Sequence, residues 1–236
     1  MRLDKYLSNS GLGSRKEIKE KIRSGSVCVN GNIITDPAFH VNETDDNILC
    51  ENQTVSYKKY IYLMLNKPAG YVCALYDKKF PVTNDLVPKQ YSHFGVFPIG
   101  RLDMDTVGLL ILTNDGNTAH RITSPKSHVD KTYYVKTAFD IKKDCTEKFL
   151  QGVVLDDGYK TMSAYLEIKG DRECFLTVRE GKFHQVKRMF EAVENKVVYL
   201  KRVKIGELCL DGSLAEGEIR ELTDVEIKLM ERGRYK

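Results

Sequence analysis

Hydrophobic and polar positions divide the first 57 residues into a short series of elements. The spacing of Leu3, Tyr6 and Leu7 predicts a helix, which ends at the two glycines that follow. A second helix is expected to begin after Ser14, because Ser14 and Glu17 have the spacing of a capping box, in which each side chain bonds the other residue's backbone N–H. Both signals are local, and together they predict a pair of short helices.

The second helix is expected to be basic on its outer side. Ile18 and Ile22 form its buried stripe, whereas basic residues spaced by four share the opposite face: Arg15, Lys19 and Arg23. Alternating valines at 27–29, followed by Asn30-Gly31, then predict a strand and a tight hairpin turn. We therefore expect a small module of two helices and a hairpin.

Beyond a polar stretch at residues 51–60, strand patterns dominate the chain. Strands are expected at 61–65, 70–75, 108–113, 132–138, 164–168, 174–178 and 197–210, and helices at 118–122, 146–150, 184–193 and 223–230. Strands without regular helical crossovers predict an α+β fold with a mixed, mostly antiparallel sheet, not a doubly wound parallel one. The expected division is a domain of residues 1–58 and a larger one of residues 59–236.

Composition narrows the class of protein. With 42% hydrophobic residues among 236, the chain can bury a core, which excludes a wholly disordered protein. No apolar run approaches the roughly 18 residues of a membrane-spanning helix, and the charged N-terminus does not resemble a signal peptide, so we expect a cytoplasmic protein. The six cysteines contain no CxxC pair, which favours reduced thiols over a zinc site or a disulfide framework.

Charge is unevenly distributed along the chain. Residues 1–34 carry seven Lys and Arg against three acids, residues 35–57 carry five acids and no Lys or Arg, and residues 179–204 carry eight basic residues against three Glu. Two basic clusters separated by an acidic stretch suggest a polyanion contacted at two places. Solvated helix faces would give the same pattern, so charge alone leaves both interpretations open.

Two segments carry candidate chemistry. In GRLDMDTVGLLILTNDG, residues 100–116, a loop with Arg101 and Asp103 precedes a buried strand, and a rigid sheet would hold that acid in position to act on a ligand. A surface pair between Arg101 and Asp103 is the alternative. In KTYYV, residues 131–135, Tyr133 and Tyr134 must face opposite sides of a strand, so only one can reach a given site.

A third segment, REGKFHQVKRMFEAV at residues 179–193, predicts a helix with an apolar stripe of Val186, Met189, Phe190 and Val193. Lys187 and Arg188 lie beside that stripe, and Gln185 precedes it. The simplest alternative role for Lys187 is an ion pair with Glu191 one turn later. His184 is expected to be a residue at the start of the helix and not a metal ligand, because no other residues have the spacing of a zinc site.

The N-terminal motifs resemble those of the S4 domain, a small RNA-binding module with an αL-type fold. RLDKYL followed by SRKEIKEKIRSGSVCVNG carries this resemblance. It implies that the second helix lies on structured RNA, with Arg15, Lys16 and Lys19 in contact.

The ordered set GRLDMDTVGLLILTNDG, KTYYV and EGKFHQVKRMF resembles the S4-containing pseudouridine synthases of ribosomal RNA, over essentially the whole chain. The resemblance implies isomerisation of one uridine in small-subunit (16S) ribosomal RNA. The bond from C1′ to N1 is cut, the base turns, and C5 is joined to C1′. No atom enters or leaves, so neither cofactor nor metal is expected.

The resemblance also implies roles for single residues. Asp103 is the catalytic aspartate, Tyr133 lies beside the base, and Lys187 is the basic partner. Arg101, Gln185 and Arg188 are expected to contact RNA. Such a reaction needs the uridine extruded from its stack, and it needs an ionised carboxylate, which a cation such as Lys187 favours. Two positions depart from the family's pattern: Tyr134 where an aliphatic residue is common, and Glu194 where a glycine often closes the helix.

Several points stay open at the level of sequence. The chain could modify large-subunit RNA instead, or could be a non-catalytic S4-type RNA-binding or ribosome-assembly factor. The substrate could be naked RNA or a small-subunit assembly intermediate, and a monomer is expected. Whether Asp103 attacks C1′, adds to C6 or abstracts a sugar proton is not specified by the residues.

Overall fold

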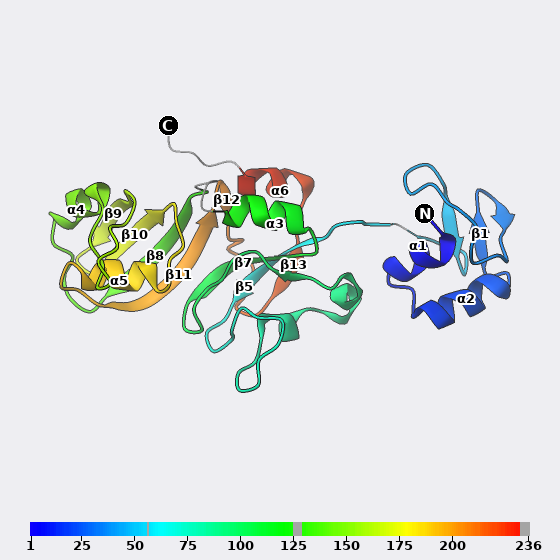
Figure 1. Ribbon diagram of the computed structural model, residues 1–236, viewed down its shortest axis with the longest axis horizontal. Coiled ribbons are helices and arrows are strands. Elements are labelled where there is room, and N and C mark those ends of the chain that lie inside the picture. Colours follow the sequence, from blue (N-terminus) through cyan, green and yellow to red (C-terminus); the bar gives the residue numbers. More distant parts are fainter. Residues whose placement is uncertain (56, 125–128, 232–236) are drawn as a thin grey trace. The chain divides into compact units, whose positions relative to one another are not determined.

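The chain divides into two compact units (Figure 1). One unit comprises residues 1–61 and 88–96, and the other comprises residues 62–87 and 97–236. The computed structural model describes residues 1–55, 57–124 and 129–231. Each unit has a hydrophobic core of its own, made only of residues from that unit.

In its described residues the small unit contains two α-helices, one 3-10 helix and a four-stranded antiparallel sheet of order β2-β1-β3-β4. Its elements are α1 (Leu3–Asn9), α2 (Arg15–Arg23), β1 (Val27–Val29), β2 (Asn32–Ile33), β3 (Ile48–Cys50), β4 (Gln53–Thr54) and the 3-10 helix η2 (Lys89–Phe94). The predicted capping box is present: the Glu17 backbone N–H donates to Ser14 Oγ, and the Ser14 N–H donates to Glu17 Oε2 at 2.7 Å. Local sequence therefore determines where α2 begins.

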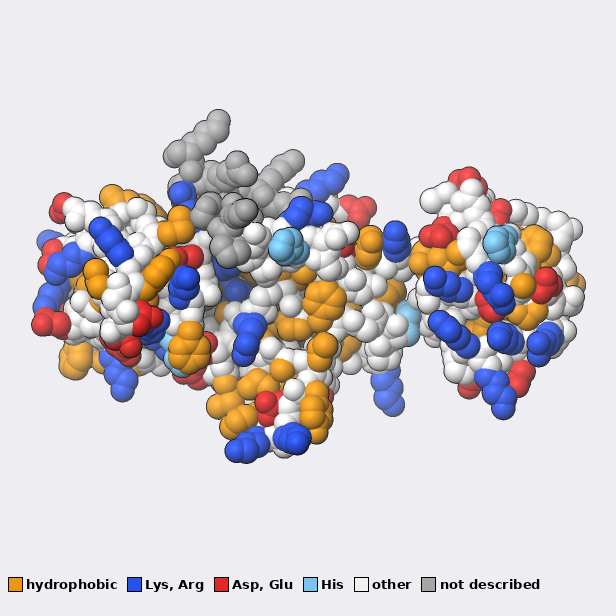
Figure 2. Space-filling model, viewed as in Figure 1, with side chains coloured by type: hydrophobic (Ala, Val, Ile, Leu, Met, Phe, Trp, Pro, Cys, Tyr) orange, Lys and Arg blue, Asp and Glu red, His pale blue; other side chains and the backbone are white. Residues whose placement is uncertain are grey.

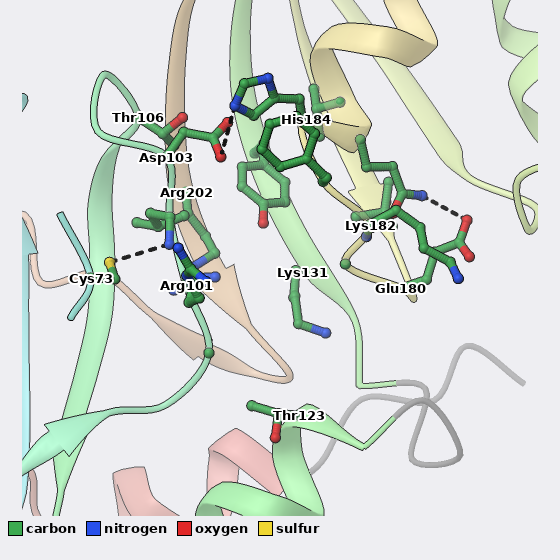
Figure 3. A pocket seen from close by; sticks show the side chains of 18 of the residues that line it. Cys73, Arg101, Asp103, Thr106, Thr123, Lys131, Glu180, Lys182, His184 and Arg202 are labelled. Carbon is green, nitrogen blue, oxygen red and sulfur yellow. Dashed lines mark hydrogen bonds and ion pairs between the residues drawn. The ribbon is translucent and has the colours of Figure 1, made fainter. Parts of the chain in front are cut away.

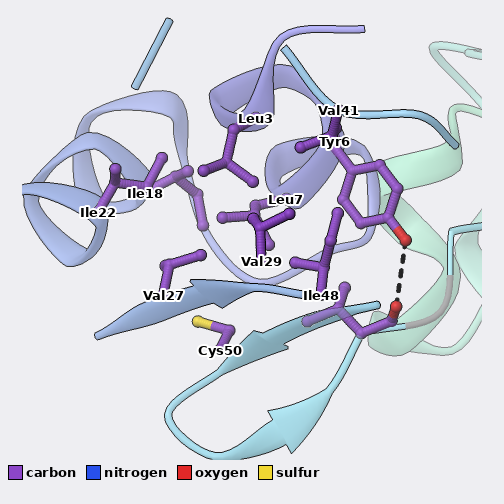
Figure 4. Packing of buried hydrophobic residues seen from close by; sticks show 11 residues of the cluster. Leu3, Tyr6, Leu7, Ile18, Ile22, Val27, Val29, Val41, Ile48 and Cys50 are labelled. Carbon is purple, nitrogen blue, oxygen red and sulfur yellow. Dashed lines mark hydrogen bonds between the residues drawn. The ribbon is translucent and has the colours of Figure 1, made fainter. Parts of the chain in front are cut away.

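Apolar faces of α1, α2 and the sheet meet in the core of this unit (Figure 4). Leu7, Ile18 and Ile22 are fully buried, as the helical spacing predicts. The hydroxyl of Tyr6 donates to the Val55 carbonyl at 3.1 Å, which ties α1 to the segment that follows the sheet. The basic side of α2 is left facing solvent.

The large unit is built on a nine-stranded sheet of order β13-β5-β7-β11-β8-β10-β9, to which β12 and β6 add at β11 and β7. Its strands are β5 (Tyr62–Lys67), β6 (Phe97–Pro98), β7 (Val107–Thr113), β8 (Lys131–Thr137), β9 (Tyr165–Gly170), β10 (Glu173–Val178), β11 (Val197–Ile205), β12 (Leu208–Cys209) and β13 (Ile219–Glu221). Its helices are η1 (Thr83–Leu86), α3 (Gly116–Thr123), α4 (Cys145–Gln151), α5 (Gln185–Glu191) and α6 (Asp224–Glu231).

Helices cover both halves of this sheet (Figure 1). α3 contributes Ala119 and Ile122, and α6 contributes Met230, to one core with side chains of β5 and β7. At the other end, Phe149 of α4 meets Phe190 of α5 edge to face, with ring centroids 5.2 Å apart. The mixed, mostly antiparallel α+β sheet predicted from the sequence is confirmed, since among the described strand pairs only β7 and β11 run parallel.

The parallel pairing of β7 and β11 explains why residue 108, in the sequence GLL, is a glycine. A Cβ at Gly108 would lie 2.3 Å from the carbonyl oxygen of Arg202, and the backbone there has a φ of +97°. Only glycine tolerates both conditions, so Gly108 allows β7 and β11 to approach.

Two strand predictions are wrong. Residues 70–75 form no strand: the Gly70 backbone turns at a φ of +87°, Val72 makes a single bridge to Val82, and Leu75 is 66% exposed. Their alternating hydrophobicity reflects a loop that buries Cys73 while leaving Leu75 in solvent. The long strand predicted at 197–210 is a hairpin of β11 and β12 instead, turning at Gly206 with a φ of +57°.

No helix in the described part of the chain is long and apolar enough to cross a membrane. All six cysteines are free thiols, and Cys209 is the exposed one.

Candidate active site

The loop that carries Asp103, residues 100–106, is held in place by a buried lysine. Lys67, at the end of β5, has no exposed surface, and its ammonium group donates to four backbone carbonyls. These are the carbonyls of Pro68 at 3.0 Å, Asp103 at 3.2 Å, Met104 at 3.2 Å and Thr106 at 2.9 Å. Burial lowers the pKa of Lys67, and nearby acidic groups oppose that shift. Lys67 therefore fixes the backbone on both sides of the Asp103 side chain.

Two side chains at the start of α5 contact the Asp103 carboxylate: Lys187 of its first turn and His184, the residue before it, whose contact is drawn in Figure 3. Lys187 Nζ lies 3.3 Å from Asp103 Oδ2, and His184 Nε2 lies 3.7 Å from Asp103 Oδ1. Among the described residues Asp103 is not paired with Arg101, so the surface-pair alternative is wrong. Lys187 is likewise directed to this site and not to Glu191, which removes the simple role considered for it.

Lys187 bridges two carboxylates. Its Nζ also lies 2.6 and 2.9 Å from the oxygens of Asp105, whose side chain is 70% exposed. Burial alone would lower the pKa of Lys187, but its hydrogen bond to Asp105 and the charges of Asp103 and Asp105 outweigh burial and raise it. For Asp105, burial would raise the pKa, but the Lys187 hydrogen bond and charge outweigh burial and lower it. Lys187 is thus a fixed cation beside Asp103.

A cavity of about 960 Å³ extends from Asp103 into the large unit. Tyr133 of β8 lines it, whereas Tyr134 lies on the opposite face beside Phe175, with ring centroids 5.6 Å apart. The prediction that only one of the two tyrosines reaches the site is confirmed. The ring of Tyr133 supplies a flat apolar surface on which a nucleobase can lie.

Two of the cations that line the cavity, Lys131 and Arg202, are largely buried (Figure 3). Lys131 and Arg202 both border it, and Arg202 is 2% exposed with one guanidinium nitrogen that has no hydrogen-bond partner in the described structure. Burial, together with the charge of Arg202, lowers the pKa of Lys131 to about 8. The part of the cavity beside Lys131 and Arg202 is therefore electropositive and suits an electron-rich or anionic group.

The other residues selected from the sequence near α5 have partners within the protein. Gln185 lines the cavity, but its amide accepts from the Lys182 N–H at 2.9 Å and donates to Glu180 at 2.7 Å. Arg188 does not line the cavity and pairs with Asp156 and Asp157. RNA contacts by Gln185 and Arg188 stay predictions, whereas Arg101 is exposed and does border the cavity.

The basic residues of α2 belong to the small unit. Arg15 and Lys16 are exposed and Lys19 is half-buried. Figure 2 shows Lys and Arg side chains gathered on the face of this unit over α2. Such a face is suited to phosphate contacts.

Sequence reasoning did not select Lys67, Lys131, Arg202 or Phe183. A lysine within the buried pattern of β5 was the available signal for Lys67, because an unpaired ammonium group is not stable in a core.

Among the described residues, no group of three or more His, Cys, Asp or Glu side chains is placed to hold a metal ion.

An α+β unit that sets a carboxylate and its paired lysine at a cavity of about 960 Å³, joined in one chain to a small module with a basic helix, is typical of a nucleic-acid-modifying enzyme. Residues 61–192 match the RNA pseudouridylate synthase family, and residues 1–47 match the S4 domain. The chain belongs to the RNA pseudouridine synthases, and the resemblance of its motifs is confirmed.

Relatives match along nearly their full lengths. An uncharacterized RNA pseudouridine synthase of Bacillus subtilis, YtzG, is 46% identical, covering 98% of each chain. Ribosomal small subunit pseudouridine synthase A of Haemophilus influenzae is 42% identical over 97% of this chain and 98% of its own, and that of Escherichia coli is 40% identical over 96% and 98%. A crystal structure of a pseudouridylate synthase matches with a TM-score of 0.69 and 39% identity, over 98% of this chain and 99% of that one.

Proposed function

We propose that this enzyme converts one specific uridine of small-subunit (16S) ribosomal RNA to pseudouridine, without a cofactor. Asp103 is the catalytic carboxylate, Tyr133 lies against the base, and Lys187 is the cation paired with Asp103. The target nucleotide leaves its stack and enters the cavity, at a cost of a few kcal/mol that phosphate contacts offset.

The observation that carries this proposal is the Lys187–Asp103 pair, 3.3 Å apart at the edge of the cavity that Tyr133 lines. A carboxylate held by a fixed loop beside a cation is poised to act as a nucleophile or base. The relatives named ribosomal small subunit pseudouridine synthase A support the choice of RNA.

We assign RNA binding to both parts of the chain. Residues 1–58 form the RNA-binding domain, with contacts from Arg15, Lys16 and Lys19, and residues 59–236 form the catalytic domain. Within the latter, Arg101 contacts the RNA where the flipped nucleotide leaves its stack, and Gln185 and Arg188 contact the RNA as well. The enzyme acts as a monomer in the cytoplasm, on ribosomal RNA or a small-subunit assembly intermediate; these assignments rest on the proposed substrate.

The proposal is tested by mapping pseudouridine in ribosomal RNA from cells with and without the gene, by carbodiimide labelling and primer extension. One small-subunit site should disappear in the deletion and return with the wild-type protein. It should not return with Asp103→Asn, although that variant should still bind the RNA. The matched control is Asp140→Asn, which changes an exposed acid paired with Arg172 at 2.8 Å and should restore the site.

The remaining outcomes separate the alternatives. A site lost from large-subunit RNA would keep the reaction and overturn the choice of RNA. Full activity of Asp103→Asn would overturn the catalytic assignment. No change anywhere in ribosomal RNA, with tight salt-dependent RNA binding, would favour a binding or assembly factor on this scaffold.

A further inference from the structure

An aromatic ring stands exposed at the wall of the active-site cavity. Phe183 lines the cavity, yet its side chain is 74% exposed. Exposed apolar residues are common singly on protein surfaces. Phe183 differs from them because it borders the site where a nucleobase must enter.

The ring of Phe183 is held in place by its neighbour. Phe183 and His184 stack with centroids 3.8 Å apart and an interplanar angle of 19°. This stack covers one face of the Phe183 ring, and the large exposed fraction leaves the other face open. The ring is thus a fixed flat surface, and fixing it beforehand reduces the entropy lost when another ring binds.

The backbone is strained where this stack forms. His184 has a φ of +49°, a left-handed conformation that is costly for a residue other than glycine. The same residue directs its imidazole to within 3.7 Å of the Asp103 carboxylate. One strained residue therefore couples the exposed ring to the proposed catalytic group.

The charges around Phe183 match an RNA strand. Lys182 precedes it with its ammonium 4.5 Å from the ring centre of Tyr159, and the exposed Arg101 borders the same cavity. Cations interleaved with flat rings are the combination that binds unstacked nucleotides, since phosphates meet the cations and bases stack on the rings.

We propose that Phe183 stacks on an RNA base that flanks the target uridine, and so holds the strand open while that uridine occupies the cavity. The proposal rests on the proposed function and deepens it by assigning a stacking subsite for a second nucleotide. Stacking uses the ring face that His184 leaves uncovered and requires no particular base.

Binding of an end-labelled ribosomal RNA fragment is measured by fluorescence anisotropy, with Asp103→Asn present in every variant so that the substrate is not consumed. Phe183→Ala should raise Kd by about 5- to 150-fold, the range for one base stacked on an aromatic side chain. Phe183→Trp should bind as Phe183 does. The matched control is Phe139→Ala, which removes a ring that is 62% exposed but does not line the cavity.

An abasic scan of the nucleotides on both sides of the target uridine locates the stacked base. Removing that base should weaken RNA binding to the protein that has Phe183 and leave RNA binding to the Phe183→Ala variant unchanged. The reason is that the two changes remove the same interaction. Additive losses at every position, or an unchanged Kd for Phe183→Ala, would overturn the proposal. Slower turnover of otherwise wild-type protein carrying Phe183→Ala, with an unchanged Kd, would also overturn it, since Phe183 would then act through His184.

These results are distinguishable from a failure of the proposed function. Binding is measured without turnover, so an unaffected Kd rejects the stacking subsite whether or not pseudouridine forms. Absence of pseudouridine with the wild-type protein rejects the proposed function alone.

Discussion

Two lysines of the large unit carry their charge inside the protein in different ways. The ammonium of Lys67 is surrounded by four backbone carbonyls and serves the loop of Asp103. That of Lys131 donates to the Val129 carbonyl at 2.9 Å and lies near the charge of Arg202. Burial lowers the pKa of both lysines, and for Lys131 the charge of Arg202 is the next-largest cause of the shift. Lys131 therefore lowers the stability of the free enzyme.

The lowered pKa of Lys131 predicts how its effect on the free energy of unfolding depends on pH. The pKa of Lys131 is about 8 in the folded protein and 10.5 ordinarily. At Lys131 the unfolded chain binds more protons between these values, so the contribution of Lys131 to the free energy of unfolding rises with pH in that window and is lowest below pH 8. Lys131→Met should thus be more stable than wild type by up to about 3 kcal/mol at pH 7. That advantage should shrink towards zero by about pH 10.5, as judged by urea denaturation with a reducing agent.

Lys136→Met is the matched control, because Lys136 lies on the same strand but pairs with Glu173 at 3.0 Å in solvent. It should show no such stabilisation at pH 7. A Lys131→Met advantage that is the same at pH 7 and pH 10 would mean that packing, and not the buried charge, causes it.

Single residues differ in how far the sequence reveals them. Asp103, Tyr133 and Lys187 could be selected because each stands in an ordered motif, and the structure brings Asp103 and Lys187 into contact. The environment of Lys131 depends on Arg202 of another strand, and the exposure of Phe183 depends on the turn at His184. Such properties arise from tertiary contacts, which local pattern does not contain.

At the scale of elements, both ends of α5 are marked by left-handed residues. His184 begins the helix, as the sequence indicated, and Glu194 follows its end with a φ of +59°. Glu194 is the position where the family's pattern often has glycine, and the backbone explains that preference, because glycine adopts this conformation without strain. The departure noted in the sequence is therefore tolerated at a local cost, outside the cavity.

The basic face of α2 gives a prediction at the same scale. If Arg15, Lys16 and Lys19 contact phosphates, reversing all three to Glu should weaken RNA binding. It should also reduce the slope of log K against log salt by about 2 to 3, at roughly 0.7–0.9 per phosphate contact. Filter binding at several salt concentrations measures both quantities. The change is confined to exposed or half-buried positions, so the fold should persist.

Reversal of Lys142, Lys148 and Lys169 provides the control, since it changes the net charge equally at three lysines paired with acids on the large unit. Its salt slope should stay close to that of wild type. An equal loss of slope in both triple variants would show that overall charge, and not α2, determines RNA binding.

At the scale of the whole molecule, the strands could be predicted more readily than their order. Period-two alternation and buried runs identify most strands, because one or both faces must meet a core. The pattern does not contain which strands pair, so the parallel neighbours β7 and β11 and the end-to-end order of the sheet came only from the structure. The loop at 70–75 was predicted wrongly for the opposite reason, because its hydrophobic and polar residues alternate although it forms no strand.

Because each unit has a hydrophobic core of its own, we expect each unit to be destabilised independently of the other. Leu7 is fully buried in the core of the small unit, and Leu7→Ala should destabilise that unit by about 2–5 kcal/mol, through lost burial and a cavity. Hydrogen exchange should then accelerate at amides of α1 and β1 while protection in β7 and β11 is unchanged. Leu110→Ala, at a fully buried position of β7, should have the opposite pattern. Equal loss of protection in both units with either variant would instead show that the chain unfolds as one cooperative body. In that case a destabilising substitution in either core would impair RNA binding and catalysis together.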